Sequence, residues 1–267
     1  MREGRPSATA LFVACARGAA GIDPIARRLV PRPFALLARA PIHRVSPLAP
    51  LVALMLVRTR AIDEVVQTDA RRGTVQVVIL GAGLCARAWR LGELGDSIVY
   101  EVDHPATQAY KRSRLGELVP TAREVRFVAV DFERDDLRNA LEKAGHSQAA
   151  PTTWIWEGVT PYLTPEAIAG TLTTVQALSS PGSTIALTYY PPSDWREHPM
   201  VRAVSLGARF LGEPFVGLMH TDEMHALLEQ SGFGVDDDAT NSELARRMGL
   251  VSAWPAIEER IVVATRR

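Results

Sequence analysis

The chain has 267 residues, of which 47% are hydrophobic and 22% are charged, so it is not intrinsically disordered and can form one α/β domain or two small ones. Thirty basic residues balance thirty acidic ones, and no overall positive field would attract nucleic acid or an anionic membrane. The two cysteines, Cys15 and Cys85, lie outside any CxxC or Cys/His cluster, which predicts reduced thiols and no metal site.

The N-terminal region contains two apolar stretches. Residues 8–14 follow two arginines and faintly resemble a signal peptide, but the run is short and Arg17 follows it closely. The stretch 41–57 contains three prolines, and its uninterrupted part is too short to cross a bilayer. We therefore expect a cytoplasmic protein that does not enter a membrane, with a buried helix over 50–57.

From Thr74 onward, short β-branched runs alternate with helix-like segments. This alternation is typical of a Rossmann-like, mostly parallel twisted sheet with helices on both faces. We predict a helical N-terminal cap over 1–73, an α/β domain over 74–267 that forms one compact unit with it, and a rim insertion over 191–216. The predicted strands are 75–80, 97–102, 125–130, 152–156, 183–189 and 260–265, and the clearest helices are 85–91, 166–178 and the segment from Thr221 to Gly232.

A glycine turn follows the first predicted strand. Gly81, Ala82 and Gly83 connect this buried strand to the helix over 85–91, and glycine lets the backbone approach a ligand without a Cβ between them. Gly81, Gly83 and Ala86 also satisfy the dinucleotide fingerprint GxGxxG/A. The turn alone therefore leaves three alternatives open, namely a dinucleotide, another nucleoside ligand, or a tight turn without a ligand.

Acidic residues follow the second strand as well. Asp103 lies about 20 residues beyond the glycines, where a carboxylate can accept hydrogen bonds from both hydroxyls of a ribose. We favour Asp103 for this contact because it lies just past the strand, and Glu101 could supply a second one. The alternative for both is a solvated acid before a helix N-terminus, where negative charge is favourable.

The third and fourth strands end in acids too. Asp131 can accept from an exocyclic adenine amine, Phe132 offers an apolar neighbour and an amide donor, and Glu157 follows the fourth strand. Ligands of open α/β sheets bind outside the carboxyl ends of the strands, so these acids should converge. A pyrophosphate needs amides and cations, whereas several acids suit a nucleoside that carries an ammonium and a sulfonium.

A set of short motifs spans most of the chain, at residues 58–64, 76–84, 87–91, 101–103 and 157–163, with weaker ones at 9–10, 23–24 and 227–233. With these motifs the sequence resembles the leucine carboxyl methyltransferase-like (PPM) family of S-adenosylmethionine-dependent methyltransferases, which includes bacterial polyketide O-methyltransferases. The resemblance implies a class I methyltransferase-like fold and S-adenosylmethionine as cofactor.

The resemblance also implies cofactor contacts. Arg58 would pair with the carboxylate of the methionine moiety, as suits a bidentate guanidinium, although on its own it could be a surface charge. The other implied contacts are Gly81, Ala82 and Gly83 at the amino-acid end, Asp103 at the ribose, Asp131 with Phe132 at the adenine, and Glu157 near the methionine ammonium or the methyl-transfer centre.

Two departures from the family pattern keep other hypotheses open. Cys85 and Ala86 replace the family's usual Asp-Thr after the glycine turn. The family also has a basic residue near the N-terminus that helps to hold the cofactor, and Arg17 is the candidate for it here. The alternatives are an NAD(P)-dependent oxidoreductase that uses the Gly81 turn, and a catalytically silent module that binds S-adenosylmethionine.

The predicted methyl acceptor is a small molecule with a carboxylate or a phenolic hydroxyl. Methyl transfer from a sulfonium is an in-line displacement that depends on alignment, and an ionised carboxylate needs no base, whereas a phenol would benefit from one. His220 and His225 are five residues apart rather than four, so we predict no metal, and the oligomeric state is left open. Candidate substrate contacts are Tyr162, Tyr190 and His220, with Tyr189 and His198 as further candidates for a base.

Overall fold

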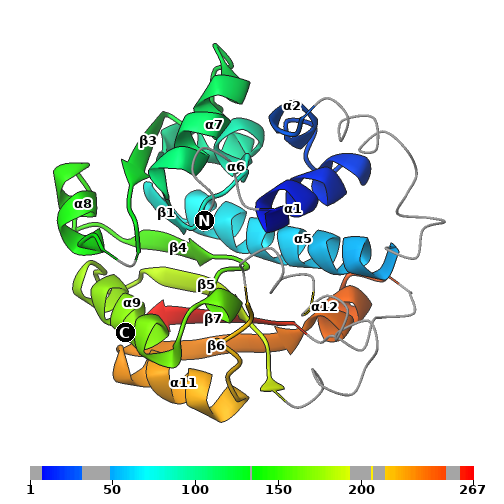
Figure 1. Ribbon diagram of the computed structural model, residues 1–267. Helices are drawn as coiled ribbons and strands as arrows, with labels where there is room; N and C mark the ends of the chain where they lie inside the picture. Colours follow the sequence, from blue (N-terminus) through cyan, green and yellow to red (C-terminus); the bar gives the residue numbers. More distant parts are fainter. Residues whose placement is uncertain (1–7, 32–48, 133, 193–205, 207–213, 251–258) are drawn as a thin grey trace. The chain divides into compact units, whose positions relative to one another are not determined.

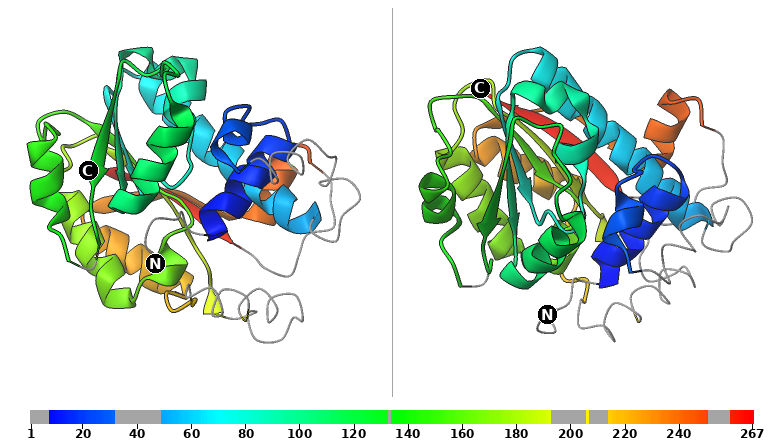
Figure 2. Two further views of the ribbon diagram at one scale, coloured as in Figure 1. Left: turned by 45° about the horizontal axis from the view of Figure 1, so that its top comes forward. Right: turned by 90° about the horizontal axis from the view of Figure 1, so that it is seen from above.

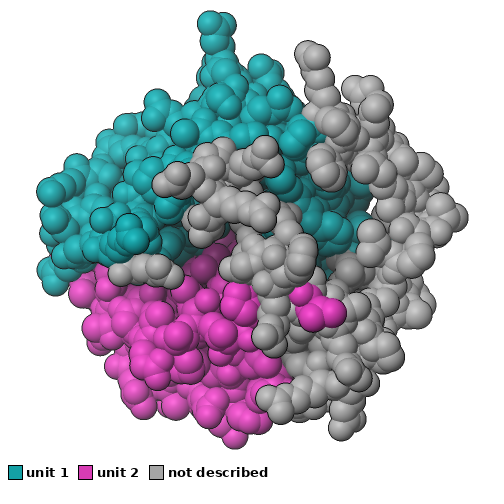
Figure 3. All heavy atoms as spheres, in the orientation of Figure 1, with its two compact units in different colours: residues 1–146 teal, residues 147–267 magenta. Residues whose placement is uncertain are grey.

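The structure is a computed structural model, and it describes residues 8–31, 49–132, 134–192, 206, 214–250 and 259–267. The chain divides into two compact units, residues 1–146 and 147–267 (Figure 3). The boundary predicted at Thr74 therefore falls inside the first unit. Most of the predicted rim insertion over 191–216, together with His198, lies outside the described residues.

The first unit contains three parallel strands in the order β3-β2-β1 (Figure 1). Their register is level, because Leu80 of β1 pairs with Val102 of β2, which in turn pairs with Val128 of β3. The carboxyl ends of the strands consequently meet at one edge. The strands are β1 (Gln76–Leu80), β2 (Ile98–Asp103) and β3 (Glu124–Ala129).

Helices surround these strands. The N-terminal helix α1 packs against α2 and α5, α2 also contacts α7, and both α7 and α8 pack against β3 (Figures 1 and 2). The elements are α1 (Ala8–Ala19), α2 (Ala26–Leu29), α5 (Ala49–Arg71), α6 (Arg87–Arg90), the 3-10 helix η1 (Gly92–Asp96), α7 (Pro105–Leu115) and α8 (Leu137–Lys143).

Helix α5 is much longer than the segment 50–57 predicted from its apolar start. Its buried positions Met55, Thr59, Ile62, Val66 and Asp69 recur every three or four residues, as expected for one face of a helix. Polar residues on this buried face obscure the periodicity, which explains the short prediction. No helix formed by the described residues is long and apolar enough to cross a membrane.

The second unit contains four strands in the order β4-β5-β7-β6. β4 and β5 are parallel, whereas β7 runs antiparallel to both of its neighbours. Helix α11 lies along β6 (Figure 1), and α12 also contacts this strand. The elements are β4 (Thr152–Trp156), the 3-10 helix η2 (Thr160–Tyr162), α9 (Pro165–Ala177), β5 (Thr184–Tyr189), α11 (Thr221–Gln230), β6 (Phe233–Thr240), α12 (Asn241–Arg247) and β7 (Arg260–Arg266).

The predicted α/β class is confirmed. All six predicted strands are present with ends within one residue of the prediction, and Thr164 caps α9 by accepting the N–H of Ala167 at 3.3 Å. The prediction missed β6, which pairs with β7 across a register shift between Val235 and Asp237. Three consecutive aspartates, residues 236–238, hide this strand, because aspartate is depleted in strands.

Candidate functional site

The turn after β1 has a backbone that only glycine adopts easily. Gly81 and Gly83 have φ values of 66° and 50°, in the left-handed region. The turn is closed by a hydrogen bond of 2.8 Å from the Cys85 N–H to the Ala82 carbonyl. A second bond, 3.0 Å from the Ala82 N–H to the Val102 carbonyl, attaches the turn to β2.

Asp103 at the end of β2 faces this turn. Its Oδ2 accepts the N–H of Gly83 at 2.5 Å, and its Oδ1 accepts the N–H of His104 at 2.7 Å. Burial raises the pKa of Asp103, while these two donors, the charge of Lys111 and a hydrogen bond from Thr107 oppose the rise. A carboxylate can accept about four hydrogen bonds, so this half-buried group can bind further donors.

Glu101 has a different environment from Asp103. It is 1% exposed, and its Oε2 lies 2.6 Å from Nζ of the equally buried Lys111. Lys111 also donates to the Cys85 carbonyl and lies 5.2 Å from the centre of the Trp89 ring. Burial raises the pKa of Glu101, and Lys111 opposes this. Glu101 is therefore linked to the end of the glycine turn through Lys111.

The adenine candidates follow β3 at the same edge of the first unit. The Val130 N–H donates to the Asp103 carbonyl at 3.0 Å, which places Asp131 and Phe132 directly beyond the end of β2. Both side chains are half-buried. The backbone contacts thus bring the glycine turn, Asp103 and the Asp131–Phe132 pair together within one unit.

Two arginines are buried on helices of the first unit. Arg58 on α5 and Arg17 on α1 are each 4% exposed, which excludes the alternative that Arg58 is a solvated surface charge. Helix α1 reaches the turn itself, since a Cβ added to Gly83 would lie 3.4 Å from the Cβ of Ala10.

A buried ionic network supports the helix that follows the turn. We define it by four residues, Asp23, Asp63, Arg87 and Arg90. Asp63 accepts from Nε of Arg87 at 2.7 Å and from Nη1 and Nη2 of Arg90 at 2.6 and 2.8 Å. Asp23, whose Oδ1 accepts the N–H groups of Ile25 and Ala26, lies 3.7 Å from Nε of Arg90. The network therefore links α5 and the start of α2 to α6.

The unusual pair Cys85 and Ala86 is buried beside this network. The two residues are 3% and 0% exposed, and Sγ of Cys85 accepts a hydrogen bond from Nη1 of Arg87 at 3.4 Å. These positions therefore pack inside the first unit. Neither side chain presents a polar group to solvent.

In the second unit, Glu157 follows β4 and is half-buried. The next segment is attached to the end of β5, because the Gly158 N–H donates to Oγ1 of Thr188 at 2.9 Å and Oγ1 of Thr160 donates to the Thr188 carbonyl at 2.5 Å. Parallel pairing of β4 with β5 thus places Glu157 at the carboxyl edge of these two strands.

The three candidate substrate contacts also lie in the second unit. The ring of half-buried Tyr162 stacks on Phe215 with 5.2 Å between the ring centroids. Tyr190 follows β5, is 8% exposed, and accepts the Met219 N–H at its carbonyl. His220 is exposed and caps α11, and its N–H donates to Glu223 at 2.9 Å.

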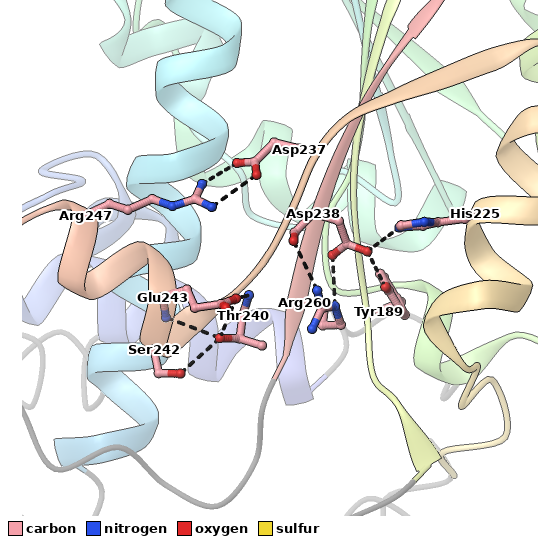
Figure 4. A network of polar contacts seen from close by, with 9 residues as sticks. All are labelled: Tyr189, His225, Asp237, Asp238, Thr240, Ser242, Glu243, Arg247 and Arg260. Atoms are coloured by element: carbon pink, nitrogen blue, oxygen red, sulfur yellow. Dashed lines mark hydrogen bonds and ion pairs between the residues drawn. The ribbon is translucent and has the colours of Figure 1, made fainter.

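A second polar cluster surrounds Asp238 on the unpredicted strand β6 (Figure 4). Asp238 accepts the Tyr189 hydroxyl and lies next to Nε2 of His225, each at 2.6 Å, and it accepts Nε of Arg260 at 2.9 Å. Burial and the hydrogen bond to Asp238 raise the pKa of Tyr189. Tyr189 is therefore a protonated donor, which argues against it as a base. Sequence reasoning missed Asp238 because it missed β6.

Within the parts of the chain that the structure describes, no group of three or more His, Cys, Asp or Glu side chains could hold a metal ion. The absence of a metal remains a prediction.

Comparison with solved structures defines the class of fold. The chain is similar to a DUF574 family protein from Streptomyces avermitilis MA-4680, with a TM-score of 0.66 and 14% identity over 99% of each chain. It is also similar to magnesium protoporphyrin IX methyltransferase (ChlM) from Synechocystis PCC 6803, whose structure contains bound SAM; the TM-score is 0.53, with 13% identity over 84% of this chain and 86% of the other. These matches confirm the predicted class I methyltransferase-like fold.

Residues 10–176 match the model of the leucine carboxyl methyltransferase family, and the chain belongs to this family. It is 42% identical over 160 residues to a "Putative S-adenosyl-L-methionine-dependent methyltransferase" from Mycolicibacterium vanbaalenii. That alignment covers 59% of this chain and 52% of the relative, so the chain spans about half the length of the curated relatives that it matches. The predicted family is confirmed.

Proposed function

We propose that the chain is an S-adenosylmethionine-dependent O-methyltransferase that acts on a carboxylate or phenolic hydroxyl of a small molecule. The observation that carries the proposal is the carboxylate of Asp103, which is held against the glycine turn by the Gly83 N–H at 2.5 Å. This group can accept ribose hydroxyls at the carboxyl edge of the sheet, where open α/β folds bind nucleosides.

The proposed cofactor contacts follow from this geometry and from the family. Asp103 would hold the ribose, and the positive φ values of Gly81 and Gly83 would let the backbone approach the methionine part. Buried Arg58 would pair with the methionine carboxylate. The remaining proposed contacts are Ala82 at the turn, Asp131 and Phe132 at the adenine, Glu157 near the ammonium or methyl group, and Glu101, whose contribution would pass through Lys111.

The same geometry disfavours a dinucleotide. Dinucleotide-binding turns direct backbone N–H groups and the N-terminus of the following helix at a pyrophosphate. Here the Gly83 N–H is directed at the anionic Asp103, and the following helix α6 has only 4 residues. The Gly83 N–H is therefore engaged by Asp103 and is not available to a pyrophosphate.

Bound S-adenosylmethionine supplies an electrophilic methyl group. The chain must then hold the acceptor oxygen in line with the carbon–sulfur bond and exclude water. The stacked rings of Tyr162 and Phe215 offer an apolar surface for an acceptor. Tyr190 and His220 are the other proposed acceptor contacts. We propose no dedicated base, since a carboxylate acceptor is already ionised at neutral pH.

The test is methyl transfer to a panel of small carboxylic acids and phenols, followed by mass spectrometry. The expected result is a gain of one methyl group on an acceptor, with formation of S-adenosylhomocysteine. Binding of S-adenosylhomocysteine without turnover on any extract would favour a silent binding module. Quenching of tryptophan fluorescence by NADH, but not by the methyl donor, would instead favour an oxidoreductase.

A further inference from the structure

The chain has two lysines, and they differ in their surroundings. Lys143, on α8, is exposed, whereas Lys111, on α7, is 1% exposed. Removing a charged ammonium from water is costly unless opposite charge and hydrogen-bond acceptors replace the solvent. The position of Lys111 therefore depends on the partners that surround it.

These partners connect Lys111 to strand β2, to the end of the glycine turn and to helix α6. Its Nζ lies 2.6 Å from Oε2 of Glu101 on β2, and it donates to the carbonyl of Cys85, where the turn ends. The ammonium also lies 5.2 Å from the centre of the Trp89 ring on α6, in the range of a cation–π contact.

The turn is consequently attached to the last residues of β2 at three points, the first of which is the hydrogen bond from the Ala82 N–H to the Val102 carbonyl. Near its middle, the Gly83 N–H donates to the carboxylate of Asp103. At its end, the Cys85 carbonyl is joined to Glu101 through Lys111. The two acids are two residues apart on one strand, so loss of the attachment through Lys111 would let the end of the turn shift relative to Asp103.

We propose that Lys111 is a positioning residue for cofactor binding. It joins the Cys85 carbonyl to Glu101, and in this way it keeps the Gly83 N–H and the Asp103 carboxylate in the arrangement that binds the ribose. The inference rests on the proposed function. Lys111 is not proposed to touch the cofactor, because the side chain is enclosed by protein.

Charge gives Lys111 a second effect on the same site. The charge of Lys111 lowers the pKa of Asp103, which favours the ionised carboxylate. Among the described residues in direct contact with Lys111 or Asp103, the other charged or titratable ones are Glu101, which faces Lys111, Cys85, whose carbonyl accepts from Lys111, and His104, which adjoins Asp103 and accepts the Ala106 N–H at Nδ1. Without Lys111 the pKa of Asp103 should be higher. As the pH is lowered, cofactor affinity should therefore begin to fall at a higher pH than it does in wild type.

The experiment is isothermal titration with S-adenosylhomocysteine between pH 8 and pH 5.5, for wild type, Lys111→Met and Lys111→Arg, with Lys143→Met as the matched control. We expect Lys111→Met to raise Kd at least about tenfold at neutral pH. As the pH is lowered from 8 to 5.5, this variant should also begin to lose affinity at a higher pH than wild type does. Lys111→Arg should retain the wild-type pH profile, and Lys143→Met should match wild type in both respects.

A double variant, Glu101→Gln with Lys111→Met, covers the case in which Lys111→Met does not fold, because it leaves no unpaired buried charge. It should also bind S-adenosylhomocysteine more weakly, since the attachment to the Cys85 carbonyl is lost. Wild-type affinity in the double variant, or a loss in Lys111→Met that is the same at every pH, would overturn the proposal. Failure of wild type itself to bind would instead refute the proposed function on which the inference rests.

Discussion

Replacing Asp63 by asparagine should lower the free energy of unfolding by about 3–5 kcal/mol, the range for breaking a buried ion pair. Asp63 accepts three hydrogen bonds from Arg87 and Arg90, whose side chains are 1% and 8% exposed. Oδ1 of Asp63 accepts two of these bonds and Oδ2 accepts one, so an asparagine that keeps an oxygen at the Oδ1 position loses one charge-assisted bond, worth about 1.5–3 kcal/mol. It also leaves both buried guanidinium groups without the charge of Asp63. Asp23, 3.7 Å from Arg90, would remain and should hold the loss near the lower end of the range.

The assay is urea unfolding followed by circular dichroism, with Glu64→Gln as the control. Glu64 is the next residue on α5 and is exposed, so its neutralisation should change stability by less than about 0.5 kcal/mol. Equal effects of Asp63→Asn and Glu64→Gln would refute the reasoning, because they would mean that the buried network contributes no more than a surface charge.

Three further predictions concern stability and ionisation. Burial lowers the pKa of His146 from 6.5 to about 4, so the neutral imidazole contributes fully to the free energy of unfolding above pH 6.5. This contribution, at most about 3 kcal/mol, should be lost as the pH falls toward 4. Unfolding measured at several pH values should show a flatter pH dependence of stability for His146→Phe. Gly217→Ala should lower the free energy of unfolding by at least about 1–3 kcal/mol, since its Cβ would lie 2.0 Å from the carbonyl oxygen of Thr160. Gly170→Ala, which has open space around its Cβ, should instead stabilise α9 by about 0.5–1 kcal/mol. Asp238→Asn should let Tyr189 ionise at a lower pH in a spectrophotometric titration, because the charge of Asp238 raises the pKa of that tyrosine; an unchanged titration would contradict the assigned hydrogen bond.

Much of the fold could be predicted from the sequence because its strands are apolar and begin and end at clear signals. The buried strands β1, β4 and β5 have uninterrupted apolar or β-branched runs. The residues after β1, β2 and β3 could be identified as site candidates, since parallel strands bring their carboxyl ends to one edge. Edge strand β6 was missed because three aspartates fill its middle.

The polar interior could not be predicted in the same way. Asp63 and Arg90 are 27 residues apart in sequence, and no local period reveals that they pair. The pair of Glu101 with Lys111 likewise forms between a strand and the helix after it, so Glu101 could be recognised as an acid near the cofactor but not as the partner of a lysine. Buried charges of this kind interrupt the apolar patterns on which sequence-based prediction depends.

The central claim is that the carboxylate of Asp103 binds the ribose of the cofactor. The most direct measurement is calorimetric titration of S-adenosylhomocysteine into wild type, Asp103→Asn and Asp96→Asn, the last being an exposed aspartate of the same unit. We predict that Asp103→Asn weakens binding at least about tenfold, as expected for loss of charged hydrogen bonds, while Asp96→Asn binds like wild type. Equal affinity in a folded Asp103→Asn variant, or no binding by wild type at millimolar ligand, would contradict the claim.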